Sequence, residues 1–295
     1  MWIVNQLLKW FGHAGQRRTL TVGGLQRTYY VHVPAHVDPN TPIPAVVALH
    51  GATMNGPMMA WFTGLNQKAD EAGFAVVYPD GTGSHSSYTW NGGNCCGPAM
   101  QNGVDDVGFI RALLDDLAQV VRVDPSRVYA TGMSNGAVMA YRLASELSDR
   151  FAAIAPVAGP MGSEKCAPSR PVSVIHCHGT DDEYAPFVGG RGPKSIFGTN
   201  FFSVEHSIRA WVKTNGCNDV PAVEDLPDRE NDGTSLTRKT FGGGTDGAEV
   251  VLVTIHGGGH TWPGRPPRSK QLGRATKNLS ANDLMWEFFV RHPMR

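Results

Sequence analysis

The sequence contains no long hydrophobic run: none of its 295 residues lies in an apolar stretch of the roughly 18 residues that a membrane-spanning helix requires. It also carries no net charge, since 26 basic residues balance 26 acidic ones. A nucleic-acid-binding protein is expected to present a basic patch, and attraction to an anionic membrane needs an excess of positive charge. We therefore expect no nucleic acid as partner, no long-range attraction to an anionic membrane and no membrane span. The oligomeric state stays open.

Cysteine is scarce and no CxxC pair occurs, which excludes the ligand spacing of a zinc ribbon. We expect no metal and no other cofactor. At most two disulfides can form, and at least one thiol stays free, among Cys95, Cys96, Cys166, Cys177 and Cys217. Glycine is abundant instead, at 35 residues, or about 12% against a usual 7% or so, without the three-residue period of collagen. This excess predicts many tight turns and close backbone approaches.

Residues 1–15 form a short apolar segment. The segment lacks the basic leading region and the small-residue cleavage site of an intact signal peptide. Its larger apolar residues fit one helical stripe, namely Ile3, Val4, Leu7, Leu8, Trp10 and Phe11. The stripe predicts a short helix packed against the body of the protein, with contact to a membrane surface or another subunit as the alternative.

Short apolar runs alternate with longer helical patterns along the rest of the chain, which is typical of an α/β fold with a mostly parallel sheet and helices on both faces. We expect strands at 27–33, 45–49, 74–78, 127–131, 152–157, 172–178 and 250–255. Helices are expected from Asp105, over 135–147 and 203–214, and from Ser280, where Asp283 completes a capping-box spacing. The polar stretch 216–248 predicts loop with an edge hairpin. No repeat or linker divides the chain, so residues 1–295 are expected to form a single domain.

The pentapeptide Gly132-Met133-Ser134-Asn135-Gly136 follows one expected strand and opens an expected helix. This strand-turn-helix context is what a nucleophile elbow requires, because the elbow presents a serine at the carboxyl edge of a sheet. A Cβ at either glycine would clash with the neighbouring strand or helix. Ser134 is the expected nucleophile, and the N–H of Asn135, at the helix N-terminus, is an expected oxyanion donor.

A serine nucleophile needs a base that removes its proton, and the base needs an acid that fixes its tautomer. His260 lies in a glycine-rich loop directly after the strand at 250–255, where its side chain can hang over the sheet edge. His260 is therefore the expected base, with His256 as second choice. Asp80 precedes the serine and breaks the order Ser, acid, His. The acid is expected among three residues that sequence position does not separate, namely Asp181, Asp182 and Glu183.

A second oxyanion donor is expected from the loop that follows the strand at 45–49. Ala52 is the first candidate there and Thr53 the next. His176 and His178 share one face of an expected strand without a third metal ligand at suitable spacing, so we expect buried, hydrogen-bonded histidines. Cys177 between them is expected to be an inert core thiol.

A basic run occupies residues 263–280 and comprises Arg265, Arg268, Lys270, Arg274 and Lys277. A solvated surface is its simplest interpretation. The sharper alternative is a role in holding an acidic or polymeric substrate.

A series of motifs occurs in order along the chain: LHGAT, YPDG, WNGGNCCGPA, VDDVGF, RVYATGMSNGAVMAYRLA, HGTDD, GGGHTWPG and SANDLMWEFF. Over about residues 25–292 the chain resembles the secreted feruloyl esterase and polyhydroxybutyrate depolymerase group of serine esterases, which is similar to carbohydrate esterase family 1. The resemblance implies an α/β-hydrolase fold. It also implies that the nucleophile is Ser134, the base His260 and the acid Asp182.

The resemblance further implies an exported, disulfide-bonded enzyme, so we expect a secreted or periplasmic location, with a cytoplasmic one as the alternative. Relatives often carry a cysteine where Ser145 stands and another near Gly242, and both are absent here. Cys217 is therefore expected to be unpaired. Whether Cys95 or Cys96 pairs with Cys166, or the two close a vicinal ring, stays open.

Together these features predict a serine carboxylic-ester hydrolase that acts through an acyl-enzyme on a small-molecule or polysaccharide-linked ester. A feruloyl (hydroxycinnamoyl) ester of plant cell walls is the first expectation, with Trp90 and Trp262 as candidate substrate contacts. A short-chain polyester such as polyhydroxybutyrate and an acetyl-xylan ester are the alternatives. An acyltransferase on the same fold and a non-catalytic binding protein are the alternatives outside this class.

Overall fold

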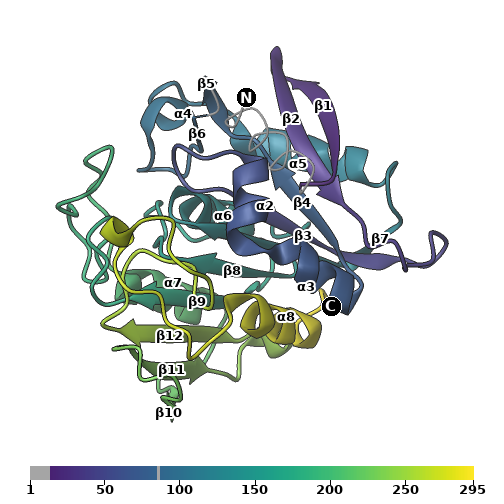
Figure 1. Cartoon of the computed structure of the whole chain (residues 1–295). Helices are drawn as coiled ribbons and strands as arrows, with labels where there is room; N and C mark the ends of the chain where they lie inside the picture. The colour runs from purple at the N-terminus through teal and green to yellow at the C-terminus, as the bar shows by residue number, and fades with distance from the viewer. Residues whose placement is uncertain (1–13, 85–86) are drawn as a thin grey trace.

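The computed structural model describes residues 14–84 and 87–295, so the expected helix within residues 1–15 falls almost wholly outside the described part (Figure 1). Ten strands in the described part form one sheet. Their order across the sheet is β1 (Gln16–Val22), β2 (Leu25–His32), β4 (Ala75–Pro79), β3 (Ile43–Leu49), β7 (Val123–Met133), β8 (Ala153–Val157), β9 (Ser173–Gly179), β12 (Val250–His256), β11 (Ser235–Phe241) and β10 (Ala222–Leu226). A separate two-stranded ribbon consists of β5 (Thr82–Ser84) and β6 (Ser87–Thr89).

The six central strands from β4 to β12 run parallel, and antiparallel strands flank them on both sides. Strands β3, β4, β8 and β9 are buried along their whole length. Complete burial explains the continuously apolar sequences of β3, β4 and β8, because helices cover both faces, while β9 also buries Ser173, His176 and His178. The expected edge hairpin within 216–248 is present as β10 and β11.

Two layers of helices sandwich the sheet (Figure 1). One core cluster joins the sheet to α5 (Asp106–Leu117), α6 (Asn135–Glu146) and α7 (Val204–Thr214). A second cluster joins the opposite face to α2 (Gly56–Thr63), α3 (Leu65–Ala72) and α8 (Ala281–Arg291). Short helical turns occur at α4 (Gly97–Gln101), η1 (Thr245–Gly247) and η2 (Lys270–Leu272). The α/β-hydrolase fold class expected from the sequence is confirmed.

The start of α5 illustrates where local sequence rules hold and where packing overrides them. Asp105 is the N-cap residue of the helix, and its side chain accepts a hydrogen bond from the N–H of Gly108, as local sequence rules predict. Asp106 is instead completely buried and pairs with Arg27 at 2.7 Å. The carboxylate of Asp106 also accepts from the N–H of Asn91, so it fastens a loop to the helix.

Helices α2 and α3 were not expected from the sequence. Each has eight residues, too few to show a helical period, and α2 is apolar all round. The capping residues define them: Asn55 accepts from the N–H of Met58, and Gly64 ends α2 in the left-handed region at φ 65°. Within the described residues, we found no helix with the length and apolar character to cross a bilayer.

Candidate active site

The strand order brings together the loops that the sequence analysis singled out. Strands β3, β7, β9 and β12 are parallel, so their carboxyl ends meet at one edge of the sheet. Ser134 follows β7, Asp182 lies in the turn after β9, and His260 lies in the loop after β12. Because β9 and β12 are hydrogen-bonded neighbours, the loops carrying Asp182 and His260 leave the sheet side by side.

Ser134 occupies a sharp turn between β7 and α6. Its backbone has φ 56° and ψ −121°, a conformation that costs a non-glycine residue energy and is maintained by its surroundings. The turn leaves no space for side chains at its flanks, because a Cβ at Gly132 would lie 2.4 Å from the carbonyl of Gly136, and a Cβ at Gly136 would lie 2.2 Å from the carbonyl oxygen of Leu49. The steric reason that the sequence suggested for both glycines therefore holds in the structure.

Asp182 and His260 form a close, buried contact. Nδ1 of His260 lies 2.7 Å from Oδ2 of Asp182, and both side chains are almost fully buried. Since an ionised carboxylate only accepts hydrogen bonds, Nδ1 carries the proton and Nε2 is left as the basic nitrogen. The ring of Tyr184 stacks against the imidazole at 5.1 Å between centroids.

The other oxygen of Asp182 is also saturated with donors. Oδ1 accepts from the backbone N–H groups of Tyr184 and Ala185, both at 2.9 Å. Burial by itself would raise the pKa of Asp182, but the charge of His260 and hydrogen bonds from His178 and His260 outweigh it and hold the pKa well below its ordinary value. Asp182 is thereby kept ionised and fixed in orientation.

A chain of buried rings runs away from Asp182 into the core. Nε2 of His178 lies 2.8 Å from the carbonyl oxygen of Ala185, Nδ1 of His178 lies 3.0 Å from Nε2 of His176, and Nδ1 of His176 lies 2.9 Å from the hydroxyl of Tyr141. The carbonyl can only accept, so the chain is satisfied with both imidazoles neutral and the Tyr141 hydroxyl donating. Burial and the neighbouring His178 hold the pKa of His176 far below its ordinary value. The expectation of buried, hydrogen-bonded histidines is confirmed.

The remaining candidates for acid and base lie elsewhere. Asp181 is exposed and accepts from the hydroxyl of Thr180, and Glu183 pairs with Lys194. His256 is exposed at the end of β12 and contacts Thr237. Asp80 accepts from the N–H of Gly56, and burial raises its pKa to about 6. Of the three acids after β9, Asp182 is the one that reaches the imidazole of His260.

The three oxyanion candidates lie around the serine. Ala52 and Thr53 line the same cavity as Ser134, and Asn135 begins α6 directly after the serine. The N–H of Thr53 already donates to the carbonyl of Tyr88 at 2.9 Å. The side chain of Asn135 is committed as well, because it pairs in both directions with the backbone of Trp90 at 2.7 and 2.9 Å. Those bonds fix the start of α6 and leave the side-chain amide of Asn135 fully engaged.

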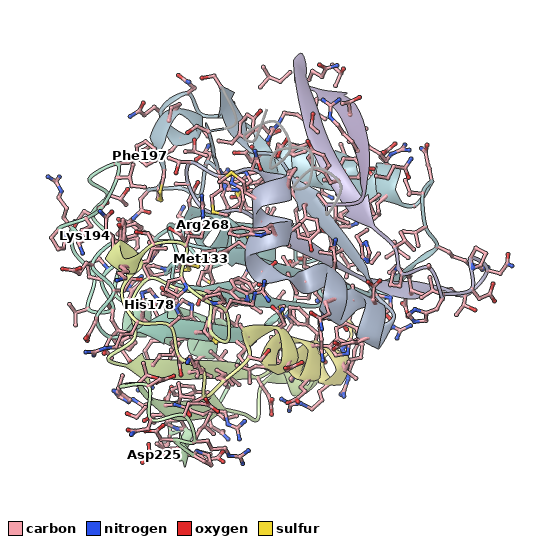
Figure 2. The ribbon with its side chains drawn as sticks, viewed as in Figure 1. Met133, His178, Lys194, Phe197, Asp225 and Arg268 are labelled. Atoms are coloured by element: carbon pink, nitrogen blue, oxygen red, sulfur yellow. A yellow bond between two sulfur atoms is a disulfide. The ribbon has the colours of Figure 1, made fainter. Side chains whose placement is uncertain are left out.

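A cavity of about 310 Å³ contains both Ser134 and His260 in its wall. Figure 2 shows Met133, Phe197 and Arg268, three lining residues from separate segments of the chain. The wall is mostly apolar, and the residues that line it are Gly51, Ala52, Thr53, Met54, Phe62, Cys96, Met133, Ser134, Tyr184, Ser195, Ile196, Phe197, Thr199, Phe201, His260, Arg268, Ser269 and Leu272. Such a chamber can receive an apolar or aromatic group beside a nucleophile.

The structure corrects the expectation that Trp90 and Trp262 touch substrate. Both indoles are completely buried, and neither lines the cavity. The N–H of Trp90 donates to the carbonyl of His50, and that of Trp262 donates to Asn282, so each ring is fixed by packing and by its own hydrogen bond. A position in a loop near the site did not predict contact with substrate, because both indole rings belong to the hydrophobic core.

Several lining residues were not expected to face the site. Ile196, Phe197 and Phe201 come from the stretch after β9, whose sequence has no periodic pattern. Phe197 is 39% exposed at the cavity, where its ring packs against Gly97. Arg268 belongs to the basic run at 263–280, and membership of that run was the sequence feature that indicated a possible contact with substrate.

The cysteines resolve a question that the sequence left open. Cys95 and Cys96 form a vicinal disulfide, while Cys166, Cys177 and Cys217 are free. Cys96 lines the cavity, and Sγ of Cys95 lies 3.7 Å from Nδ2 of Asn135. Burial raises the pKa of the Cys177 thiol to about 12, as expected of an inert core thiol.

The resemblance implied cysteines in relatives at Ser145 and near Gly242; in this structure Ser145 lies close to the free Cys166, and Gly244, two residues after Gly242, lies close to the free Cys217. The hydroxyl of Ser145 accepts from the N–H of Ala167, the residue after Cys166, at 3.1 Å. A Cβ at Gly244 would lie 2.8 Å from Sγ of Cys217. Cys217 is unpaired, as expected.

Comparison with known proteins places these features in context. Residues 28–184 match the family model described as "Esterase PHB depolymerase", a match that includes Ser134 and Asp182 and ends before His260. Among curated proteins, the chain is 32% identical over 294 residues to the "Putative esterase NocK" of Nocardia uniformis subsp. tsuyamanensis, with 92% of this chain and 82% of that protein covered. It is 30% identical over 246 residues to feruloyl esterase B of Piromyces equi, with 79% of this chain but only 42% of that protein covered.

Solved structures show the same fold. An acetyl xylan esterase from Aspergillus awamori matches with a TM-score of 0.60 and 18% identity, over 93% of this chain and all of that one. At this level of identity the likeness concerns the arrangement of the sheet and helices.

Proposed function

Since the chain belongs to the esterase PHB depolymerase family and is a serine carboxylic-ester hydrolase, we propose that Ser134 is its nucleophile, His260 its general base and Asp182 the acid that orients the base. The contact of 2.7 Å between His260 Nδ1 and Asp182 Oδ2, in the wall of a cavity that also contains Ser134, carries the proposal. The chain order of serine, acid and histidine agrees with it.

The reaction then follows from the proton positions. Nε2 of His260 takes the hydroxyl proton of Ser134 as Oγ attacks the ester carbonyl carbon. His260 next gives that proton to the departing alcohol oxygen, and the acyl group stays on Ser134. Water, deprotonated by His260, attacks the acyl-enzyme and releases the carboxylic acid. Asp182 stays ionised throughout and stabilises the imidazolium, as its lowered pKa allows.

The oxyanion of each tetrahedral intermediate needs two preorganised donors. We assign them to the backbone N–H groups of Asn135 and Ala52. The position of Asn135 at the start of α6 adds the favourable end of a helix dipole. Ala52 is preferred to Thr53 because the Thr53 N–H is already bonded to Tyr88.

For the substrate we propose a hydroxycinnamoyl ester. The cavity supports this class because Phe62, Phe197 and Phe201 supply aromatic surface beside the serine. A relative named feruloyl esterase B points the same way. The family name favours a short-chain polyester such as polyhydroxybutyrate as the second candidate, and the acetyl xylan esterase likeness makes an acetylated sugar the third.

A comparison of kcat/KM for methyl ferulate, an acetylated xylo-oligosaccharide and a hydroxybutyrate oligomer tests the substrate class. We expect methyl ferulate to give the highest value. If methyl ferulate is not cleaved while another ester is, the hydroxycinnamoyl assignment is wrong and the triad assignment survives.

The nucleophile is tested separately with p-nitrophenyl acetate. Ser134→Ala should lower kcat by about 10⁴-fold or more, because the remaining groups cannot form an acyl-enzyme. Ser195→Ala is the matched control, since Ser195 lines the same cavity without a partner role in the proposed reaction. Retained activity in Ser134→Ala would show that another residue is the nucleophile.

A further inference from the structure

The cavity wall contains one permanently charged side chain within the described part of the chain, that of Arg268. The lining residues there include no aspartate, glutamate or lysine. Arg268 as a whole residue is exposed, yet the surrounding protein removes enough water from its guanidinium to lower its pKa. A guanidinium nevertheless stays protonated in proteins. A positive charge therefore stands in the wall of a mostly apolar chamber.

Two cations near Arg268 in the sequence or at the cavity are already bonded to protein groups. Arg265, three residues earlier, donates to the carbonyl oxygens of Phe62 and Trp61 at 3.4 and 3.5 Å. Lys194, across the cavity rim, pairs with Glu183 and donates to the carbonyl of Gln271. Within residues 14–84 and 87–295, Arg268 forms no ion pair with a carboxylate, and burial by the surrounding protein lowers its pKa.

The backbone on which Arg268 sits is tied to the loop of the proposed base. The N–H of His260 donates to the carbonyl of Leu272 at 2.7 Å, and the N–H of Gly259 donates to the carbonyl of Arg274 at 2.9 Å. Ser269 caps the helical turn η2 that follows. These bonds hold the segment from Ser269 to Arg274, which directly follows Arg268, against the loop that carries His260.

We propose that Arg268 is a specificity residue that binds a carboxylate on the ester substrate, so that the enzyme prefers esters whose acyl or alcohol part carries a negative charge. A guanidinium is the side chain best matched to a carboxylate, because its planar fork donates two parallel hydrogen bonds. Low-dielectric walls strengthen the attraction relative to bulk water. The terminal carboxylate of a hydroxyacid oligomer and the carboxylate of a uronic acid sugar share this chemistry. The inference rests on the proposed function of the same site.

Two pairs of esters, each a carboxylate with its neutral carboxamide, test the inference. Monoethyl adipate and its amide place the charge on the acyl side. The 3-hydroxybutyrate dimer, acetylated on its free hydroxyl, and the corresponding amide place it on the alcohol side. For at least one pair we expect wild-type kcat/KM to favour the carboxylate, and Arg268→Gln to reduce that preference by roughly tenfold, the factor that corresponds to about 1.4 kcal/mol. Arg268→Lys should keep part of it.

The controls separate the inference from the proposed function. Arg274→Gln removes a charge from the same run at a residue that does not line the cavity, and should leave the ratio unchanged. Rising salt should weaken the wild-type preference and leave that of Arg268→Gln unaffected. Methyl ferulate is assayed alongside as the substrate of the proposed function. If it and all four esters are inert, the proposed function fails; if methyl ferulate is cleaved and all four esters are inert, the inference alone is overturned. If they are cleaved but the carboxylate-to-amide ratio is the same in wild type and Arg268→Gln for both pairs, the inference is overturned and the proposed function stands. The pair whose carboxylate-to-amide ratio falls in Arg268→Gln shows whether Arg268 binds the acyl or the alcohol part of the ester.

Discussion

Nε2 of His178 lies 3.3 Å from Oδ2 of Asp182, and both side chains are completely buried. The contact links the proposed acid to a chain of rings that the reaction itself does not touch. His178 is a positioning residue in this arrangement, because it helps to hold the carboxylate that in turn orients the base.

His178→Phe should lower kcat by roughly tenfold with little change in KM. The substitution keeps the ring but removes a hydrogen bond to an ionised group, an interaction worth about 1.5–3 kcal/mol. Tyr141→Phe is the matched control: it removes the hydroxyl at the far end of the chain and should cost about 1–3 kcal/mol of stability while kcat is kept. Steady-state kinetics and thermal unfolding measure the two effects. An unchanged kcat in His178→Phe would show that the hydrogen-bonded side chains beyond Asp182 contribute to stability and not to the orientation of Asp182.

His50 should make the protein less stable as the pH falls from 6.5 to 4. Its Nδ1 donates to the carbonyl of Gly51 and its Nε2 accepts from the N–H of Gly81, so the neutral ring is the bonded form. Burial lowers the pKa of His50 from an ordinary 6.5 to about 4. Between these values the unfolded chain binds the proton and the folded chain does not, which removes about 3 kcal/mol of the free energy of unfolding by pH 4.

Over part of that pH range Asp80 has the opposite effect on the free energy of unfolding. Burial raises its pKa to about 6, so the folded state binds a proton that the unfolded state does not, and this contribution stabilises the fold as the pH falls. The difference between wild type and His50→Gln isolates the histidine contribution. Denaturant unfolding at several pH values should give a shallower decline for His50→Gln. Parallel pH curves would contradict the assignment.

Gly136→Ala should prevent folding or cost about 3 kcal/mol or more of stability. A Cβ there would lie 2.2 Å from the carbonyl oxygen of Leu49 and 2.6 Å from that of His50, both backbone atoms of the strand and loop that lead to Ala52. Gly242→Ala is the matched control, since nothing lies within 4 Å of its Cβ and its φ is not positive. That variant should stay within about 0.5 kcal/mol of wild type. Equal soluble yield and melting temperature for both variants would refute the steric argument.

Ser145→Cys should form a disulfide with Cys166. The hydroxyl of Ser145 already contacts the N–H of the residue that follows Cys166. Closing a loop of about 20 residues is expected to stabilise the fold by about 3 kcal/mol. Wild type has three free cysteines, so the variant should titrate as two thiols in denaturant instead of four. Four thiols under oxidising conditions would show that the two sulfur atoms do not meet.

The sequence predicted those features of the structure that depend on a few consecutive residues, and it did not predict those that depend on contacts between distant segments. The strands leading to Ser134, Asp182 and His260 were predicted because they are short runs rich in β-branched and apolar residues that end at glycines. The choice among Asp181, Asp182 and Glu183 needed the resemblance or the structure, because it depends on which side chain of a turn faces β12. Local sequence carries no record of that direction.

The cavity wall was largely beyond prediction. Phe197 and Phe201 lie in a stretch without period, and their position follows from contacts with segments distant in the sequence, such as the packing of Phe197 on Gly97. Trp90 and Trp262 were misjudged for the converse reason. Aromatic residues in loops near a site were expected to face it, whereas the completely buried indoles satisfy their N–H groups within the protein.

The adjacency of β9 and β12 has a consequence for how such an enzyme can be modified. The contact between the proposed acid and base depends on a ladder between two strands, whereas Phe197 and Phe201 belong to a segment that leaves the end of β9. The segment after Arg268 is different, because its backbone is hydrogen-bonded to that of His260. Exchange of the segment that carries Phe197 and Phe201 between homologous enzymes therefore offers a route to new selectivity that leaves the strand pairing and the His260 loop intact.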